Sequence, residues 1–191
     1  MPMIKNFNYK NGTLKILYNE SPIVTDYKQD WKKYQIERMT FPVVRNYRLG
    51  VELEIYKGGR ICYGMLGVCV QPNEEINCVK LEIAFTQENR IRYYDSCLYD
   101  DRSVYKGLPE EYVEAVIGKV TSEILKRDKY PQYKIVFECA ANCEVGSSSM
   151  IYELISGIII NIISENICEK IMDMDIESFT QQFANNVNLH Y

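Results

Sequence analysis

Two adjacent glycines, Gly58 and Gly59, most constrain what this chain can fold into, because they stand between two predicted β-strands. Residues 51–55 alternate apolar and glutamate side chains, which predicts a half-buried strand, and residues 66–70 predict a second strand. Paired glycines permit positive φ angles, and Lys57 and Arg60 place charge beside that bare backbone. We therefore expect a hairpin whose apex makes contacts; a plain structural turn is the alternative.

The rest of the chain from residue 72 alternates strand and helix patterns. Pro109, followed by two glutamates, predicts the start of a helix. The expected segments are a strand at 79–85, a helix at 109–125, a strand at 133–137, a loop of small residues at 140–149, an apolar helix at 150–164 and an amphipathic segment at 165–187. The order βββ–α–β–α predicts an α+β fold, with helices stacked on one face of the sheet.

Residues 1–49 are predicted to be an extension that packs on a main domain of residues 50–191. The extension opens with a β-hairpin over residues 8–18, which turns at Asn11-Gly12. Residues 23–48 then interleave aromatic side chains with lysines and arginines. Such a pattern can stack bases and hold phosphates; the alternative is an amphipathic edge strand that packs its aromatic side chains on the main sheet.

Charge is unevenly distributed along the chain. The net charge is −4, which alone disfavours a non-specific nucleic-acid binder. Residues 1–48 carry nine Lys and Arg against four Asp and Glu, whereas residues 49–191 carry thirteen against twenty-two. The basic amino-terminal segment therefore favours RNA, and the acidic remainder favours a protein partner.

Three motifs, in order, resemble domain IV of elongation factor G and its relatives. They are Gly58-Gly59-Arg60-Ile61-Cys62-Tyr63-Gly64, Gly107-Leu108-Pro109-Glu110-Glu111-Tyr112-Val113-Glu114-Ala115-Val116 and Cys143-Glu144-Val145-Gly146-Ser147-Ser148. The resemblance covers residues 50–168. It implies the ribosomal-protein-S5-domain-2-like fold, a two-layer sandwich with a four-stranded sheet, two or three helices on one face and a left-handed βαβ crossover, here with an N-terminal β extension.

In that family the domain reaches the ribosomal decoding centre, and its two tip loops correspond to residues 57–64 and 140–148. The resemblance therefore implies a non-catalytic, translation-related module that binds the ribosome or structured RNA. A guanidinium can clamp a phosphate, and a serine before a helix can cap it and present N–H groups to an anion. The expected RNA-binding residues are Lys57, Gly58, Gly59, Arg60, Asn142, Cys143, Ser147 and Ser148.

The chain also departs from the family pattern. Cys143 replaces the tip histidine, Gly146 replaces the acid before the serines, and Met65 replaces a histidine that often follows Tyr-Gly. No GxxxxGK[ST] loop occurs, so we expect no bound nucleotide and no GTP-driven translocation. A stand-alone protein-interaction module, which kept the fold but lost ribosome binding, is the alternative function.

Catalytic chemistry has little support in the sequence. The sole histidine, His190, lies next to the C-terminus, so we expect no catalytic residue, no metal and no cofactor. A thiolate site from Cys62, Cys139 and Cys143 was considered, but incidental thiols are the better interpretation. Seven cysteines without a CxxC pair, and no basic-then-apolar leader, favour a reducing cytoplasm. The apolar residues 154–163 are too few to span a bilayer.

Overall fold

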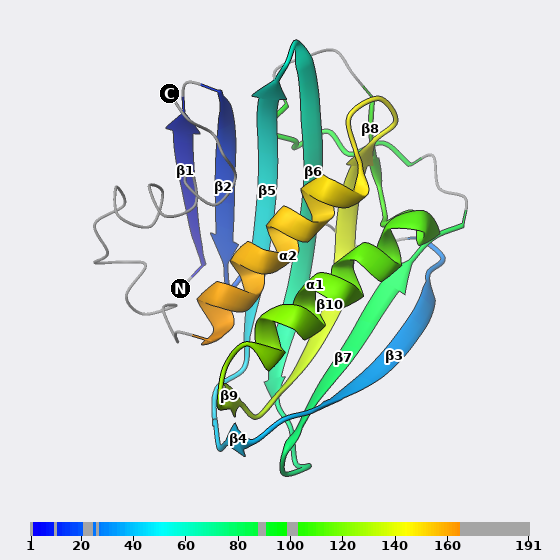
Figure 1. The fold of residues 1–191 in the computed structure, drawn as a ribbon. Helices are drawn as coiled ribbons and strands as arrows, with labels where there is room; N and C mark the ends of the chain where they lie inside the picture. Colours follow the sequence, from blue (N-terminus) through cyan, green and yellow to red (C-terminus); the bar gives the residue numbers. More distant parts are fainter. Residues whose placement is uncertain are drawn as a thin grey trace.

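Figure 1 shows the fold as a computed structural model, which describes residues 2–9, 11–20, 25, 27–87, 91–98 and 103–164. The strands are β1 (Met3–Tyr9), β2 (Gly12–Tyr18), β3 (Asp30–Glu37), β4 (Thr40–Phe41), β5 (Tyr47–Lys57), β6 (Arg60–Pro72), β7 (Cys78–Phe85), β8 (Val104–Lys106), β9 (Tyr130–Pro131) and β10 (Tyr133–Cys143). The helices are the short 3-10 helix η1 (Glu110–Tyr112), α1 (Val113–Leu125) and α2 (Ser149–Ser164).

One mixed sheet of eight strands dominates the described part of the chain. Its order is β1-β2-β5-β6-β10-β7-β3, and β8 pairs with the far end of β10. All pairs in this sheet are antiparallel except β7 and β10, which are parallel. The strands β4 and β9 form a separate two-stranded parallel pair. The chain is therefore built around a wide sheet rather than around its helices.

Both α-helices cover the same face of the sheet (Figure 1). Helix α1 buries a stripe that includes Val113, Val116, Val120 and Ile124, and α2 is apolar over most of its surface. These side chains pack on the residues of β5, β6, β7 and β10 that point to the helix side and form the main core. The layer thus follows from the helical spacing seen in the sequence.

Helix α1 lies on the connection between the parallel neighbours β7 and β10. With both strands pointing up and α1 in front of the sheet, β10 lies to the left of β7 (Figure 1). This is the left-handed form of a β–α–β connection, which is rare in proteins.

The opposite face of the sheet carries a second, smaller core. It contains Tyr63, Met65, Tyr93, Val104, Cys139, Ala141 and Cys143, with Cys97 and Leu98 packed against it. The backbone of this segment is tied down, since the N–H of Tyr93 donates to the carbonyl of Val104 at 2.9 Å. Residues 93–98 therefore cover part of the face that lacks helices.

The predicted fold class is wrong in the size of its sheet. A four-stranded sheet with two or three helices was expected, whereas the sheet has eight strands and the described residues contain two α-helices. The difference arises because the amino-terminal residues add strands at both edges: β2 pairs with β5, and β3 pairs with β7. Backbone N–H and C=O groups along a strand need partners, and a neighbouring strand supplies them.

Individual elements match the sequence more closely. The hairpin of β1 and β2, the third strand and both predicted helices are confirmed, although Gly12 pairs with Tyr9 and opens β2 instead of lying in the turn. Residues 30–37 form the expected edge strand β3, but Trp31 and Phe41 remain exposed, so the packing of the aromatic side chains is confirmed only in part. The loop expected to start at residue 140 is wrong, because β10 continues to Cys143. The half-buried interpretation of residues 51–55 is also wrong, because Glu52 and Glu54 are buried. The segment predicted at 165–187 lies outside the described residues.

Candidate functional site

The apex of the β5–β6 hairpin is a two-residue turn. Lys57 pairs with Arg60 across the strands, and Gly58 and Gly59 have φ angles of 58° and 74°. Two successive positive φ angles between paired residues define the turn type that matches the twist of a hairpin. No heavy atom lies within 4 Å of a Cβ built at either glycine, so the requirement for glycine is conformational. The plain-turn alternative thus describes the backbone here.

The β10–α2 loop is fastened to the hairpin just below this apex. The N–H of Tyr63 donates to the carbonyl of Gly146 at 3.1 Å, and the Ser147 hydroxyl donates to the carbonyl of Tyr63 at 2.8 Å. The same hydroxyl accepts from the N–H of Cys143 at 2.8 Å, and the Ser147 N–H donates to the Cys143 carbonyl at 3.0 Å. The two predicted tip loops therefore lie together, joined by side-chain and backbone hydrogen bonds.

Two tyrosines from the helical layer hold the loop from the other side. The Tyr152 hydroxyl donates to the carbonyl of Ala141 at 2.9 Å, and the Tyr112 hydroxyl donates to the carbonyl of Ser147 at 3.3 Å. Their rings stack with centroids 5.0 Å apart. Burial is the main reason that the pKa of Tyr112 rises to about 12, so its hydroxyl keeps its proton at neutral pH. The loop is therefore joined to η1 through Tyr112, and the end of β10 that leads into it is joined to α2 through Tyr152.

The expected site residues divide into exposed and inward-facing groups. Gly58, Gly59 and Arg60 are exposed, and Arg60 makes no hydrogen bond or ion pair with the part of the chain that the structure describes. Cys143 is buried, and the Asn142 amide donates to the carbonyl of Gly107 at 2.9 Å. The remaining three are Lys57, whose side chain lies outside the described residues, and the half-buried Ser147 and Ser148.

Ser147 is bonded within the loop instead of capping α2. The Ser147 hydroxyl is used within the loop, and its N–H is already bonded to Cys143. Ser148 contributes its carbonyl, which accepts from the N–H of Ile151 at 3.1 Å in the first turn of the helix. Among the described side chains of the predicted set, the guanidinium of Arg60 is the exposed cation that can meet a phosphate, beside the bare glycine backbone.

The Tyr-Gly pair of the hairpin motif has a packing role. Gly64 lies under α2, where an added Cβ would come within 3.1 Å of Ile155 and 3.2 Å of Ile151. Tyr63 points to the other face, is buried, and donates its hydroxyl to Glu52 at 2.7 Å. Burial, followed by the charge of Glu52, raises the pKa of Tyr63 well above its usual value. These two residues therefore build the hairpin rather than contact a ligand.

Two buried glutamates were missed by the sequence pattern. The Glu52 carboxylate also accepts from the N–H of Cys97 at 2.8 Å and lies 3.4 Å from the Lys15 ammonium. Glu54 accepts from the Tyr56 hydroxyl at 2.7 Å, whereas its second oxygen is buried and has no hydrogen-bond partner among the described residues. A two-residue turn fixes the register that sets Glu54 opposite Tyr63. This register could have been predicted from the sequence, and it would have placed Glu54 beside Tyr63.

The thiol beside these carboxylates is not set up for nucleophilic attack. Burial is the main reason that the pKa of Cys97 is raised, and the charges of Glu52 and Glu54 add to it. A thiol held in its protonated form is a poor nucleophile and a poor metal ligand.

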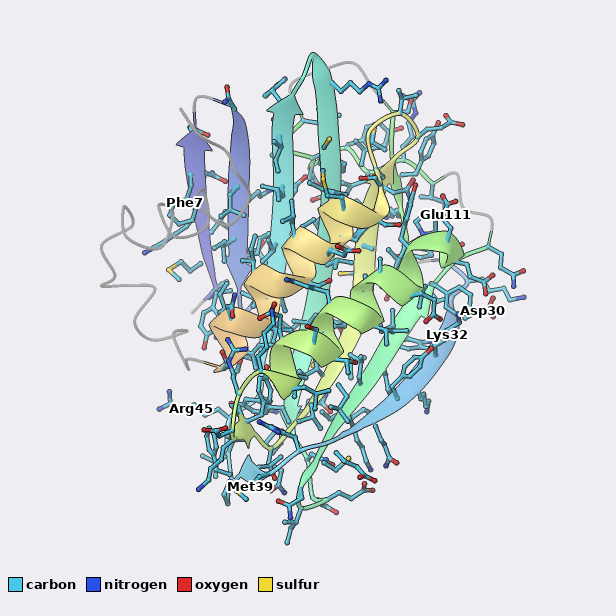
Figure 2. All side chains as sticks on the ribbon, in the orientation of Figure 1. Phe7, Asp30, Lys32, Met39, Arg45 and Glu111 are labelled. Atoms are coloured by element: carbon cyan, nitrogen blue, oxygen red, sulfur yellow. The ribbon has the colours of Figure 1, made fainter. Side chains whose placement is uncertain are left out.

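The basic amino-terminal segment is used largely in ion pairs with the rest of the chain. Figure 2 shows Lys32 where β3 passes the start of α1, and its ammonium lies 3.1 Å from Glu114. The other pairs are Lys15–Glu52, Lys33–Glu82, Arg38–Asp128 and Arg48–Glu138. Five of the nine cations in residues 1–48 thus meet acids from residues 49–191, so the uneven charge joins the two parts instead of forming a cationic face.

The three cysteines considered as a thiolate site do not converge. Cys62 packs against the main core on the helix side of the sheet, whereas Cys139 and Cys143 belong to the second core on the opposite face. Within the described ranges there is no group of three or more His, Cys, Asp or Glu residues placed to hold a metal ion.

Within the described ranges, no helix is both long and apolar enough to cross a membrane.

Comparisons with known proteins identify no relative of this chain. The chain matches none of the protein-family models compared with it, and no curated protein matches its sequence.

Proposed function

We propose that this chain is a non-catalytic, cytoplasmic module that binds structured RNA, and specifically the ribosome, through the apex of the β5–β6 hairpin. The observation that carries the proposal is the pairing of the two loops. Hydrogen bonds between Tyr63, Gly146 and Ser147 hold the β10–α2 loop against the hairpin, while Arg60 stays exposed beyond them. A rigid support with an exposed cation at its end loses little entropy on binding.

The chemistry at the apex suits phosphate better than bases. A guanidinium donates two parallel hydrogen bonds to a phosphate, and glycines without side chains let the backbone approach closely. The exposed aromatic ring next to the turn is that of Tyr56, whose hydroxyl is bonded to Glu54 at 2.7 Å, whereas Tyr63 is buried. Folded RNA is recognised mainly by shape and backbone, whereas unpaired bases are usually read by stacking on aromatic side chains. The apex therefore fits a helical, structured RNA.

Two further features support the proposal. The left-handed β7–α1–β10 connection is rare and is shared with the translation-factor family that the three motifs resemble. The six described cysteines carry no disulfide, which agrees with a location in the reducing cytoplasm, where ribosomes are found.

The test is co-sedimentation of the purified protein with ribosomes at low and at physiological salt. We expect salt-sensitive pelleting, because phosphate contacts release counterions. Arg60→Ala should weaken binding by roughly tenfold, or about 1.4 kcal/mol, without changing thermal stability. Lys33→Ala is the matched control, because it removes one positive charge from an exposed side chain on β3, whose ion-pair partner is Glu82.

Equal weakening by both variants would mean that net charge alone drives pelleting, and the apex proposal would fail. Loss of stability together with binding in Arg60→Ala would make the residue structural.

A protein partner is the second candidate, and one observation favours it. Val145, in the loop beside the apex, is an apolar side chain that is strongly exposed. Binding through this residue would be insensitive to salt and would be lost in Val145→Ser, whereas RNA binding through Arg60 would survive that change. The same co-sedimentation assay, repeated with Val145→Ser, therefore separates the two functions.

A further inference from the structure

The end of the molecule opposite the apex carries four strongly exposed apolar side chains. In Figure 1 the pair β4–β9 lies at the bottom and the β5–β6 apex at the top, and Figure 2 places Met39 at the same lower end. The exposed fractions are 56% for Met39, 42% for Phe41, 89% for Val44 and 77% for Ile76. We call these four residues the distal patch. Apolar patches of this kind on a protein surface commonly mark interaction sites.

The backbone that presents the distal patch is firmly hydrogen-bonded. The carbonyls of Met39 and Phe41 accept from the N–H groups of Tyr130 at 3.1 Å and Gln132 at 2.9 Å. The loop before β7 is joined to the same place, since the N–H of Asn77 donates to the Thr40 hydroxyl at 3.0 Å. The exposed side chains therefore stand on an ordered support.

The alternation of a strand explains why two members of the patch point outward. Thr40 turns inward, where its side chain meets Asn77 and Gln132. Met39 and Phe41 flank Thr40, so their side chains share the opposite side of the strand. Ile76 precedes Asn77, whose N–H donates to the Thr40 hydroxyl, so the backbone of Ile76 lies next to this strand. Val44 follows β4 on the connection to β5.

Charges at the border of the patch differ in sign from one side to the other. Arg38, Arg45 and Lys129 are the chain neighbours of Met39, Val44 and Tyr130, and two acids stand among them: Glu37, and Asp128 at 4.0 Å from Arg38. The border next to Ile76 carries Glu74 and Glu75, and Glu75 is paired with Lys80 at 2.5 Å. One border is therefore net positive and the other net negative.

We propose that the distal patch is a self-association surface whose occupant is a second copy of this chain, related by a twofold axis. In a twofold interface each residue meets its complement in both directions. The positive border of one copy then faces the negative border of the other, so Lys129 meets Glu74 of the partner subunit twice. The apolar side chains lie between these borders, as in other interfaces with an apolar centre and a polar rim.

The size of the patch sets the strength of the association. Four side chains and their rim are far fewer than the roughly 20–30 residues per partner found in stable complexes. The dissociation constant of the dimer should therefore lie above about 1 µM, and the dimer should exchange with monomer.

The first experiment is analytical ultracentrifugation of the full chain over roughly 1–300 µM. We expect a reversible monomer–dimer equilibrium that Ile76→Glu weakens by at least tenfold. Val145→Glu, which places the same charge on an exposed apolar residue at the other end, should leave the equilibrium unchanged. A chain that stays monomeric throughout overturns the proposal, and so does a dimer that only Val145→Glu dissolves.

The second experiment asks whether the occupant is a second copy in twofold contact. Lys129→Glu and Glu74→Lys should each weaken the dimer, because each sets like charges opposite one another. Their combination restores opposite charges at both contacts, so the double variant should recover the original dissociation constant. Failure of the double variant to recover it overturns the twofold arrangement. Neither experiment depends on RNA binding.

Discussion

Replacing Glu52 by alanine tests the polar contacts that support the hairpin behind its apex. The carboxylate is buried and meets three groups: the Tyr63 hydroxyl at 2.7 Å, the Cys97 N–H at 2.8 Å and the Lys15 ammonium at 3.4 Å. Alanine removes all three interactions and leaves the Tyr63 hydroxyl and the Cys97 N–H without this acceptor in a largely water-free place. Lys15 loses its counter-charge and keeps its hydrogen bond to the Asp95 carbonyl at 3.3 Å. We expect a large loss in the free energy of unfolding, while the fold itself stays the same.

The size of the stability loss depends on the groups that lose their partner. Removing one member of a buried charge pair costs about 3–5 kcal/mol, because the remaining charge is desolvated without compensation. The Lys15 side chain is 16% exposed, so it can regain some water and the lower end of the range applies. For a chain of this size each kcal/mol lowers the melting temperature by roughly 2–4 °C. We therefore expect a fall of roughly 6–12 °C for about 3 kcal/mol.

A double-mutant cycle assigns the share of Tyr63, with stability measured by urea unfolding. Tyr63→Phe deletes one hydrogen bond to a charged acceptor and should cost about 1.5–3 kcal/mol. Because both single variants remove the same bond, the double variant should fall short of additivity by at least about 0.5 kcal/mol. Glu153→Ala, at an exposed position of α2, is the control. A loss below about 1 kcal/mol for Glu52→Ala, or strict additivity, would refute the reasoning.

Two other outcomes follow from named residues. Gly12→Ala should destabilise the chain by at least about 2 kcal/mol, because the added Cβ would collide with the Glu54 carbonyl. Gly59→Ala has open space around the added Cβ and should cost only the strain of a left-handed backbone, about 1–2 kcal/mol. Equal urea midpoints for the two variants would contradict this contrast. Burial acts to raise the pKa of Glu123, but hydrogen bonds from Lys119 and Lys126 outweigh it and lower the pKa. A lowered pKa adds stability above the ordinary value of 4.5 that is lost as pH falls through the folded value, so wild type should lose more stability below pH 4.5 than Glu123→Gln in acid unfolding.

Local patterns predicted the elements well because each rests on neighbouring residues. The helical stripe of α1, the alternation of β7 and the apolar run of α2 each require only short-range spacing. The hairpin of β1 and β2 was equally local, although the turn indicated by Asn11-Gly12 is displaced by one residue, because Gly12 already pairs with Tyr9.

Long-range pairing accounts for what the sequence pattern did not predict. Nothing in residues 30–37 indicates that their partner lies at residues 78–85, so β3 could be predicted as an edge strand but not placed. Glu52 and Glu54 looked solvated because alternation identifies two faces without saying what covers the second. Here residues 93–98, far along the chain, cover it. The candidate site shared this limit, because Asn142 and Ser147 turned inward to partners on other elements.

The amino-terminal strands cover the outer edges of two inner strands: β2, with β1 beyond it, pairs with β5, and β3 pairs with β7. A shortened chain that begins near residue 47 would uncover unpaired backbone groups along two long strands at once. Exposed strand edges of this kind recruit other chains and lead to aggregation. We therefore expect the shortened chain to aggregate, and its recovery in the soluble fraction is the measurement that checks this.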